Sequence, residues 1–205
     1  MPATPTQPVS GSTRPGGRTA RTRAAVRDAT LAELAAHGYR GLTVEGVAER
    51  SGVHKTTVYR RWGGVDGLIV DALDLATGDD WQPRDTGTFA GDCRALADEV
   101  RHSFADQTEG AASTAIVAAS FQSTLAADAL REFYADRHAR SEAVVTRAVA
   151  RGELPVGTDA GAVVRAVVAP LYHRLFVTRE PVDERVTERA ATAAVTAALA
   201  GVFEK

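Results

Sequence analysis

The segment TVEGVAERSGVHKTTVYRRWGG, residues 43–64, contains two short helical patterns separated by one glycine. In its first half, Val44, Val47 and Ala48 recur at spacings of three and four, the period of a helix with one buried face. Thr43 precedes this pattern and is a preferred N-cap residue. The first half therefore predicts a short helix whose apolar face packs against the rest of a domain.

Gly52 is predicted to end this first helix, which spans residues 44–51, because glycine readily adopts the left-handed conformation that closes a helix. A second short helix is predicted over residues 54–62, with Val58 and Trp62 four residues apart on its inward face. Two short helices joined by a tight turn form a helix-turn-helix. In that motif the second helix enters the major groove of DNA, so its outward face must be polar.

The outward face of this second helix carries side chains that suit DNA. Arginine and lysine donate to guanine edges, threonine contacts a thymine methyl group, and tyrosine reaches a phosphate oxygen. The outward set is His54, Lys55, Thr56, Thr57, Tyr59, Arg60 and Arg61. The segment therefore predicts contact with double-stranded DNA.

Charge is unevenly divided along the chain. Residues 1–61 carry ten Arg and Lys against four Asp and Glu, a net charge of +6, whereas the remaining residues carry 14 basic against 22 acidic side chains, a net charge of −8. A basic head on an acidic body is typical of a protein that binds a polyanion through its head. Residues 1–17 are rich in proline and glycine, so they are predicted to be a disordered arm with a basic end.

The rest of the chain is helical by composition and period. Helical patterns lie near residues 18–37, 65–78, 88–107, 111–122, 127–151, 158–178 and 183–203. Gly38 is expected to end the first of these, and Pro170 to kink the helix that contains it. Asp79 and Asp80 follow the second pattern and are expected to be solvated loop residues. Because no alternating run predicts a strand, the fold class is all-α, with about nine helices.

Other functional classes find little support in the residues. The single cysteine, Cys93, excludes an intrachain disulfide and a cysteine-based zinc site, and it is expected to be a small core residue. His37, His102 and His138 have no second ligand at metal spacing, so no metal or other cofactor is expected. No nucleophile with a base, paired carboxylates or phosphate-binding loop indicates an enzyme. No long apolar run or signal peptide is visible, which predicts a cytoplasmic protein without a membrane partner.

The run GVHKTTVYRRW, residues 52–62, resembles the run GVSxGTLYxHF that typically ends the three-helix head of TetR-family transcriptional regulators. The preceding ATLAELAAHGYRGLTVEGVAERS also resembles the first two helices of that family, and the match covers about Arg18 to Asp71. LREFYADRHARSEAVVTRAVARGELP and APLYHRLF look like stretches of the family's C-terminal domains. One position departs from the family, because Val65 replaces a phosphate-binding lysine that many members carry.

The resemblance implies a ligand-responsive regulator of transcription, usually a repressor that a small molecule releases from its operator. With the predicted helices, it divides the chain into an arm (1–17), a helix-turn-helix head (18–64) and a ligand-binding and dimerisation body (65–205). The candidate DNA-binding residues are Arg18, Thr43, His54, Lys55, Thr56, Thr57, Tyr59, Arg60 and Arg61. By analogy, Lys55, Thr56 and Arg60 are the candidates for base edges, and the phosphate contacts fall to Thr43, Tyr59, His54 and Arg61.

The effector and the second subunit are expected to bind the body. An apolar and aromatic pocket would take a small molecule, and the available large side chains include the candidates Phe104, Phe121, Tyr134, Tyr172, His173 and Phe176. The last two helical patterns, 158–178 and 183–203, are dense in alanine and valine. In the family the corresponding helices form the interface of a homodimer, which is the implied assembly.

A helical adaptor that binds only protein is the alternative. In that case the helix-turn-helix would be a packing unit, and the outward cations would be solvated charges. The net charge of +6 on residues 1–61 favours DNA.

Overall fold

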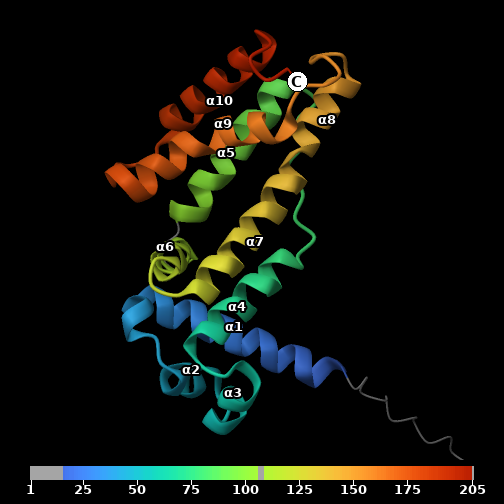
Figure 1. The fold of residues 1–205 in the computed structure, drawn as a ribbon. Helices are drawn as coiled ribbons and strands as arrows, with labels where there is room; N and C mark the ends of the chain where they lie inside the picture. The colour runs from blue at the N-terminus through green and yellow to red at the C-terminus, as the bar shows by residue number, and fades with distance from the viewer. Residues whose placement is uncertain (1–15, 106–108, 205) are drawn as a thin grey trace, which may run out of the picture.

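The computed structural model describes residues 16–105 and 109–204, and in these residues helices are joined by loops without any strand (Figure 1). The elements are α1 (Gly16–Gly41), α2 (Val44–Ser51), α3 (Lys55–Trp62), α4 (Val65–Thr77), α5 (Phe89–Ala105), α6 (Glu109–Ser120), α7 (Thr124–Ser141), α8 (Ala143–Ala150), α9 (Ala160–Tyr172), η1 (His173–Thr178) and α10 (Glu184–Leu199). The all-α prediction is confirmed. The arm predicted over residues 1–17 lies outside the described residues except for its last two.

Local signals set the ends of the head helices. Gly38 interrupts α1 with a φ of 65°, so the predicted break is confirmed, although one further turn follows it. The Thr43 hydroxyl caps α2 by accepting from the Gly46 N–H at 3.0 Å. Gly52 and Gly63 close α2 and α3 in the left-handed conformation, with φ of 67° and 75°. Both short helices therefore lie where the sequence predicts them, to within one residue.

The core of the head continues into the body. Val26, Leu34, Val47 and Val58 are almost fully buried, and Trp62 is only 8% exposed, so its predicted core position is confirmed. The same cluster includes residues of three further helices, namely Leu68, Ile69 and Leu73 of α4, Ala112, Ile116 and Ala119 of α6, and Ala126 of α7. The head thus packs on α6 through α1 and on α4 through α1 and α3, so a movement of α4 reaches the helix-turn-helix directly.

A second core lies at the opposite end of the molecule, where α5, α8, α9 and α10 pack together (Figure 1). Cys93 is fully buried in it, as predicted. By length and composition alone, Ala160–Thr178, with a mean hydropathy of 1.3, could span a membrane. Its Val163, Val167 and Leu171 are instead buried in this core, which is the behaviour of a core helix.

Two predicted helices differ in detail from the structure. The pattern over 127–151 is divided at Glu142 into α7 and α8. The pattern over 158–178 contains Pro170, and the helix widens into the π-helical turn η1 just after it. Proline lacks an N–H and its ring crowds the preceding turn, so the helix already lacks one hydrogen bond at this residue.

Candidate functional site

The outward face of α3 is exposed, while its inward face is buried. The exposed DNA-binding candidates are Arg18, Thr43, His54, Lys55, Thr56, Tyr59, Arg60 and Arg61. Thr57 is half-buried. Apart from Arg18 in the first turn of α1, these residues come from α3, its cap and the cap of α2. The structure therefore brings most of the candidates onto one side of the head.

The start of α3 is held by its own side chains. His54 Nδ1 accepts from the Thr56 backbone N–H at 3.4 Å and lies 2.9 Å from the Thr56 hydroxyl. The predicted DNA contacts of these two residues would have to form around this mutual contact. Their geometry is local, so it needs no support from the body.

Tyr59 connects α3 to the first turn of α2. Its side chain is 47% exposed, and its hydroxyl donates to Glu45 at 3.4 Å. This contact places the phenol near the N-terminus of α2, beside the Thr43 cap. Backbone N–H groups at a helix N-terminus attract anions, so the arrangement suits a phosphate of the DNA backbone.

The cations of the head fall into two groups. Arg23, Arg27 and Arg50 form ion pairs with carboxylates of α1 or α4. Within the described residues, Lys55 and Arg60 pair with no carboxylate. A cation without a partner can bind DNA without first breaking an ion pair. The exposed face of α3 therefore carries positive charge that is available to a partner.

Four of the six effector candidates form one aromatic cluster, defined here as Phe104, Tyr134, Tyr172 and Phe176. The Phe104 ring lies edge-on to Phe176 and Tyr172, with centroids 5.3 and 6.2 Å apart, and Tyr134 lies 5.5 Å from Tyr172. Burial raises the pKa of both tyrosines, so their phenols stay neutral at physiological pH. The cluster joins α5 and α7 to the continuous segment of α9 and η1, three parts of the chain that are distant in sequence.

The other two effector candidates lie elsewhere. Phe121, just after α6, is 85% exposed, so the structure does not bring it into the cluster. His173 is exposed at the start of η1. Helical period alone cannot separate an inward ring from an outward one at the end of a helix, where the chain turns away.

One member of the aromatic cluster also borders a groove. Phe104 lies beside an open groove of about 500 Å³, between Leu34 of α1 and the alanines of α6.

The connector between α4 and α5, residues 78–88, corrects one prediction. Asp79 is not merely solvated, because it forms ion pairs with Arg137 at 2.7 Å and Arg140 at 2.9 Å. Burial would raise the pKa of Asp79, but hydrogen bonds from Arg137 and the Trp81 N–H outweigh it and lower the pKa below its usual value. Asp80 is exposed, as predicted. No sequence signal indicated these pairs, because their partners lie about 60 residues away on α7.

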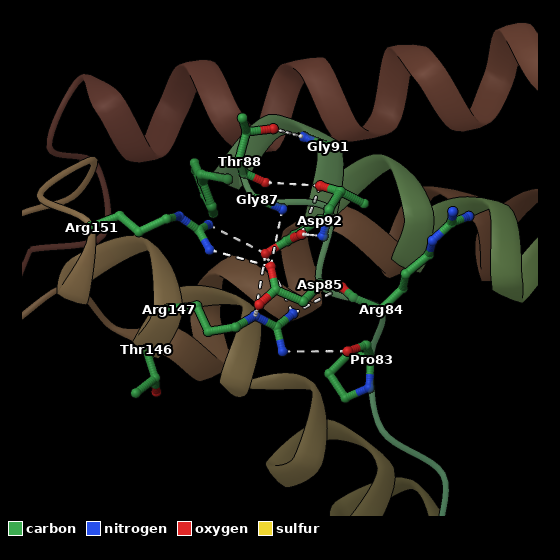
Figure 2. Close-up of polar contacts among 12 residues, drawn as sticks. Pro83, Arg84, Asp85, Gly87, Thr88, Gly91, Asp92, Thr146, Arg147 and Arg151 are labelled. Carbon is green, nitrogen blue, oxygen red and sulfur yellow. Dashed lines mark hydrogen bonds and ion pairs between the residues drawn. The ribbon is translucent and has the colours of Figure 1, made fainter.

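Asp92 of α5 anchors the other end of the connector (Figure 2). Its carboxylate is fully buried and accepts from the Thr86 N–H at 2.6 Å and the Thr86 hydroxyl at 2.8 Å. Arg147 of α8 and Arg151, the residue that caps the end of α8, reach the same carboxylate at 3.4 and 3.3 Å. Burial would raise the pKa of Asp92, but these hydrogen bonds and positive charges lower it. The connector is thus bound to α7 at one end and to α8 at the other.

Within the described parts of the chain, no three His, Cys, Asp or Glu side chains are grouped to hold a metal ion. Burial raises the pKa of the Cys93 thiol to about 12, which keeps it protonated and unreactive.

Comparison with known proteins gives the same assignment for both parts of the chain. Residues 26–72 match the model of bacterial regulatory proteins of the tetR family, and residues 83–194 match the tetracyclin repressor-like C-terminal domain. The chain is 33% identical to the HTH-type transcriptional regulator AqdR of Rhodococcus erythropolis, over 78% of this chain and 76% of that protein.

Two further relatives extend the comparison. The DNA-binding transcriptional repressor TetR of Mycobacteroides abscessus is 33% identical over 74% of this chain and 80% of that protein. The crystal structure of the TetR family transcription regulator SCO0332 superposes with a TM-score of 0.66 at 31% identity, covering 88% of this chain and 98% of that one.

Proposed function

Because the chain belongs to the tetR family of bacterial regulatory proteins, we propose that it is a cytoplasmic repressor that a small molecule releases from its operator. The observation that carries the DNA-binding part is the outward face of α3, where Lys55 and Arg60 are exposed and unpaired within the described residues. In contrast, Arg23, Arg27 and Arg50 of the head are neutralised by carboxylates.

On DNA, α3 enters the major groove and α2 lies against the backbone. Lys55 and Arg60 donate to base edges, and Thr56 contacts a thymine methyl group. Thr43 and Tyr59 contact phosphates near the N-terminus of α2. Val65 is half-buried and packs against the core of the head. Its apolar side chain therefore supplies no contact to a DNA phosphate in place of the family's usual lysine.

The partner protein is a second copy of the chain, bound through α9 and α10. The exposed faces of these helices carry small side chains, including Ala169 and Pro170 on α9 and Thr192, Ala193 and Thr196 on α10. Small residues allow two helices to approach closely, and a dimer places two heads on half-sites about 34 Å apart. Sedimentation velocity at micromolar concentration should give a dimer, and a monomer would contradict this assembly.

The effector binds at the aromatic cluster. Its rings lie between helices of the body, and apolar sites between helices with a few polar groups are typical of small-molecule pockets. Effector and DNA favour different arrangements of head and body, so each weakens the binding of the other by the same factor.

Fluorescence anisotropy with a labelled duplex from the region upstream of the protein's own gene tests the function. A scrambled duplex of the same composition is measured beside it at two salt concentrations. Specific binding should weaken by about 1–3 kcal/mol in Arg60→Ala and in Lys55→Ala, because each removes a base contact. Arg131→Ala is the matched control, since Arg131 is exposed on α7 and forms an ion pair with nearby Asp128.

The outcomes of this experiment separate the possibilities. Equal binding of both duplexes at low salt alone would mean that the head is merely basic. The absence of binding at every salt concentration would favour the helical adaptor.

A further inference from the structure

Arg137 of α7 contacts the aromatic side of the body. Its guanidinium lies over the ring of Trp81 at 4.4 Å and over the ring of Phe133 at 5.3 Å. Phe133 in turn packs against Tyr134 of the aromatic cluster, with ring centroids 5.4 Å apart. The Trp81 indole N–H donates to Glu99 of α5. Arg137 therefore lies where the rings of α7 meet the connector.

The same guanidinium holds the end of α4. It donates to the Ala76 carbonyl at 3.3 Å and to the Asp79 carboxylate at 2.7 Å, and Arg140 donates to the Thr77 carbonyl. These carbonyls belong to the last turn of α4, where helical hydrogen bonds end and cations are favourable. Leu68, Ile69 and Leu73 of the same helix are buried in the core of the head. A displacement of Arg137 would thus be passed to the helix on which the head packs.

One donor of Arg137 is left over. Its Nε–H is buried, and among the described residues it has no hydrogen-bond partner. A buried donor without an acceptor is costly, and such groups require a reason in a native structure. An arginine that satisfies only part of its donors at this position can exchange for another arrangement when its surroundings change.

We propose that Arg137 is a positioning residue that couples the aromatic cluster to α4, and through α4 to the DNA-binding head. The inference rests on the proposed function, because it assigns the path between the two binding events. Coupling is reciprocal, so DNA bound at α3 must change the surroundings of Trp81 even when no effector is present. This consequence can be measured without knowing the effector.

The experiment uses fluorine NMR of the full chain labelled with 5-fluorotryptophan. The chain has two tryptophans, Trp62 in the head and Trp81 in the connector, and Trp81→Phe assigns the two resonances. In the native chain, saturation with the duplex from upstream of its own gene should shift both resonances. In Arg137→Met the shift at Trp62 should remain, and most of the shift at Trp81 should disappear. Arg137→Lys should restore only part of it, because lysine keeps the charge but not the planar fork.

Arg131→Met provides the matched control. It removes an arginine from the same helix, and the Arg131 side chain is 71% exposed. It should behave like the native chain. Circular dichroism verifies that each variant is folded. If Arg137→Met does not fold, Arg137→Lys is used for the test instead.

A DNA-induced shift at Trp81 that is the same in the native chain and both Arg137 variants would overturn the proposal. Specific DNA binding without a shift at Trp81 in the native chain would also overturn it, whether or not Trp62 responds. If neither resonance responds and anisotropy detects no specific binding, the proposed function itself fails, and the coupling with it.

Discussion

The cations of the head and the arginines that bind the connector are held in opposite ways. On the head, Lys55 and Arg60 extend from a helix whose ends are set by a cap at His54 and a glycine at residue 63. At the connector, Arg147 of α8 is committed to the Asp92 carboxylate and to the Pro83 and Arg84 carbonyls, 55 to 64 residues away. The first set is free to bind a partner, whereas the second ties parts of the molecule together.

This difference separates the charged side chains that are available to bind DNA from those that stabilise the fold. A cation on a locally capped helix keeps its geometry when the rest of the molecule moves. A cation between helices changes its contacts whenever the helices shift, which suits it to transmit a signal. The two sets should therefore respond differently to substitution.

Replacing Asp92 with alanine should have the largest effect, because it leaves two arginines without their buried carboxylate. Unfolding in urea, followed by circular dichroism, should show a loss of about 3 kcal/mol in the free energy of unfolding. The exposed Asp80→Ala is the control and should change that free energy by less than about 0.5 kcal/mol. Equal losses in the two variants would mean that the connector is not held by Asp92.

Gly52→Ala should have an intermediate effect and acts on the head. Gly52 has a φ of 67°, and an alanine there would meet open space but an unfavourable backbone conformation. The expected loss of stability is about 1–2 kcal/mol in thermal unfolding. Gly64→Ala is the control, because its added methyl group also meets open space and its backbone is extended. If Gly64→Ala is equally destabilising, the left-handed turn is not what matters at Gly52.

Acid should produce the smallest effect, and it acts through Asp92. The pKa of Asp92 is lowered in the folded protein, so its carboxylate stabilises the fold above the unfolded pKa of about 3.9 and loses that contribution as pH falls further, through the folded pKa. The free energy of unfolding should therefore fall more steeply below about pH 4 in the native chain than in Asp92→Asn. Parallel pH profiles of the two proteins would show that Asp92 does not contribute.

Much of the head could be predicted because its signals are local. Thr43 caps a helix within three residues of itself, and Gly52 ends one by its own backbone freedom. The exposed face of α3 likewise follows from period and polarity. The ion pairs of Asp79 were missed, because nothing near this residue in the sequence indicates which helix will lie beside it. Phe121 was misplaced for a related reason, since its exposure depends on where α6 ends in space.

By itself, the sequence determined the helical periods, the caps and the basic outward face, because each depends on residues within about one helical turn of one another. Only the tertiary structure decided that Arg137 faces Trp81 and α4, that Asp92 pairs with Arg147 and Arg151 at the end of α8, and that four aromatic residues meet. These contacts join residues far apart in the chain. The partners in such long-range contacts depend on how the helices pack, and no local sequence pattern specifies that packing.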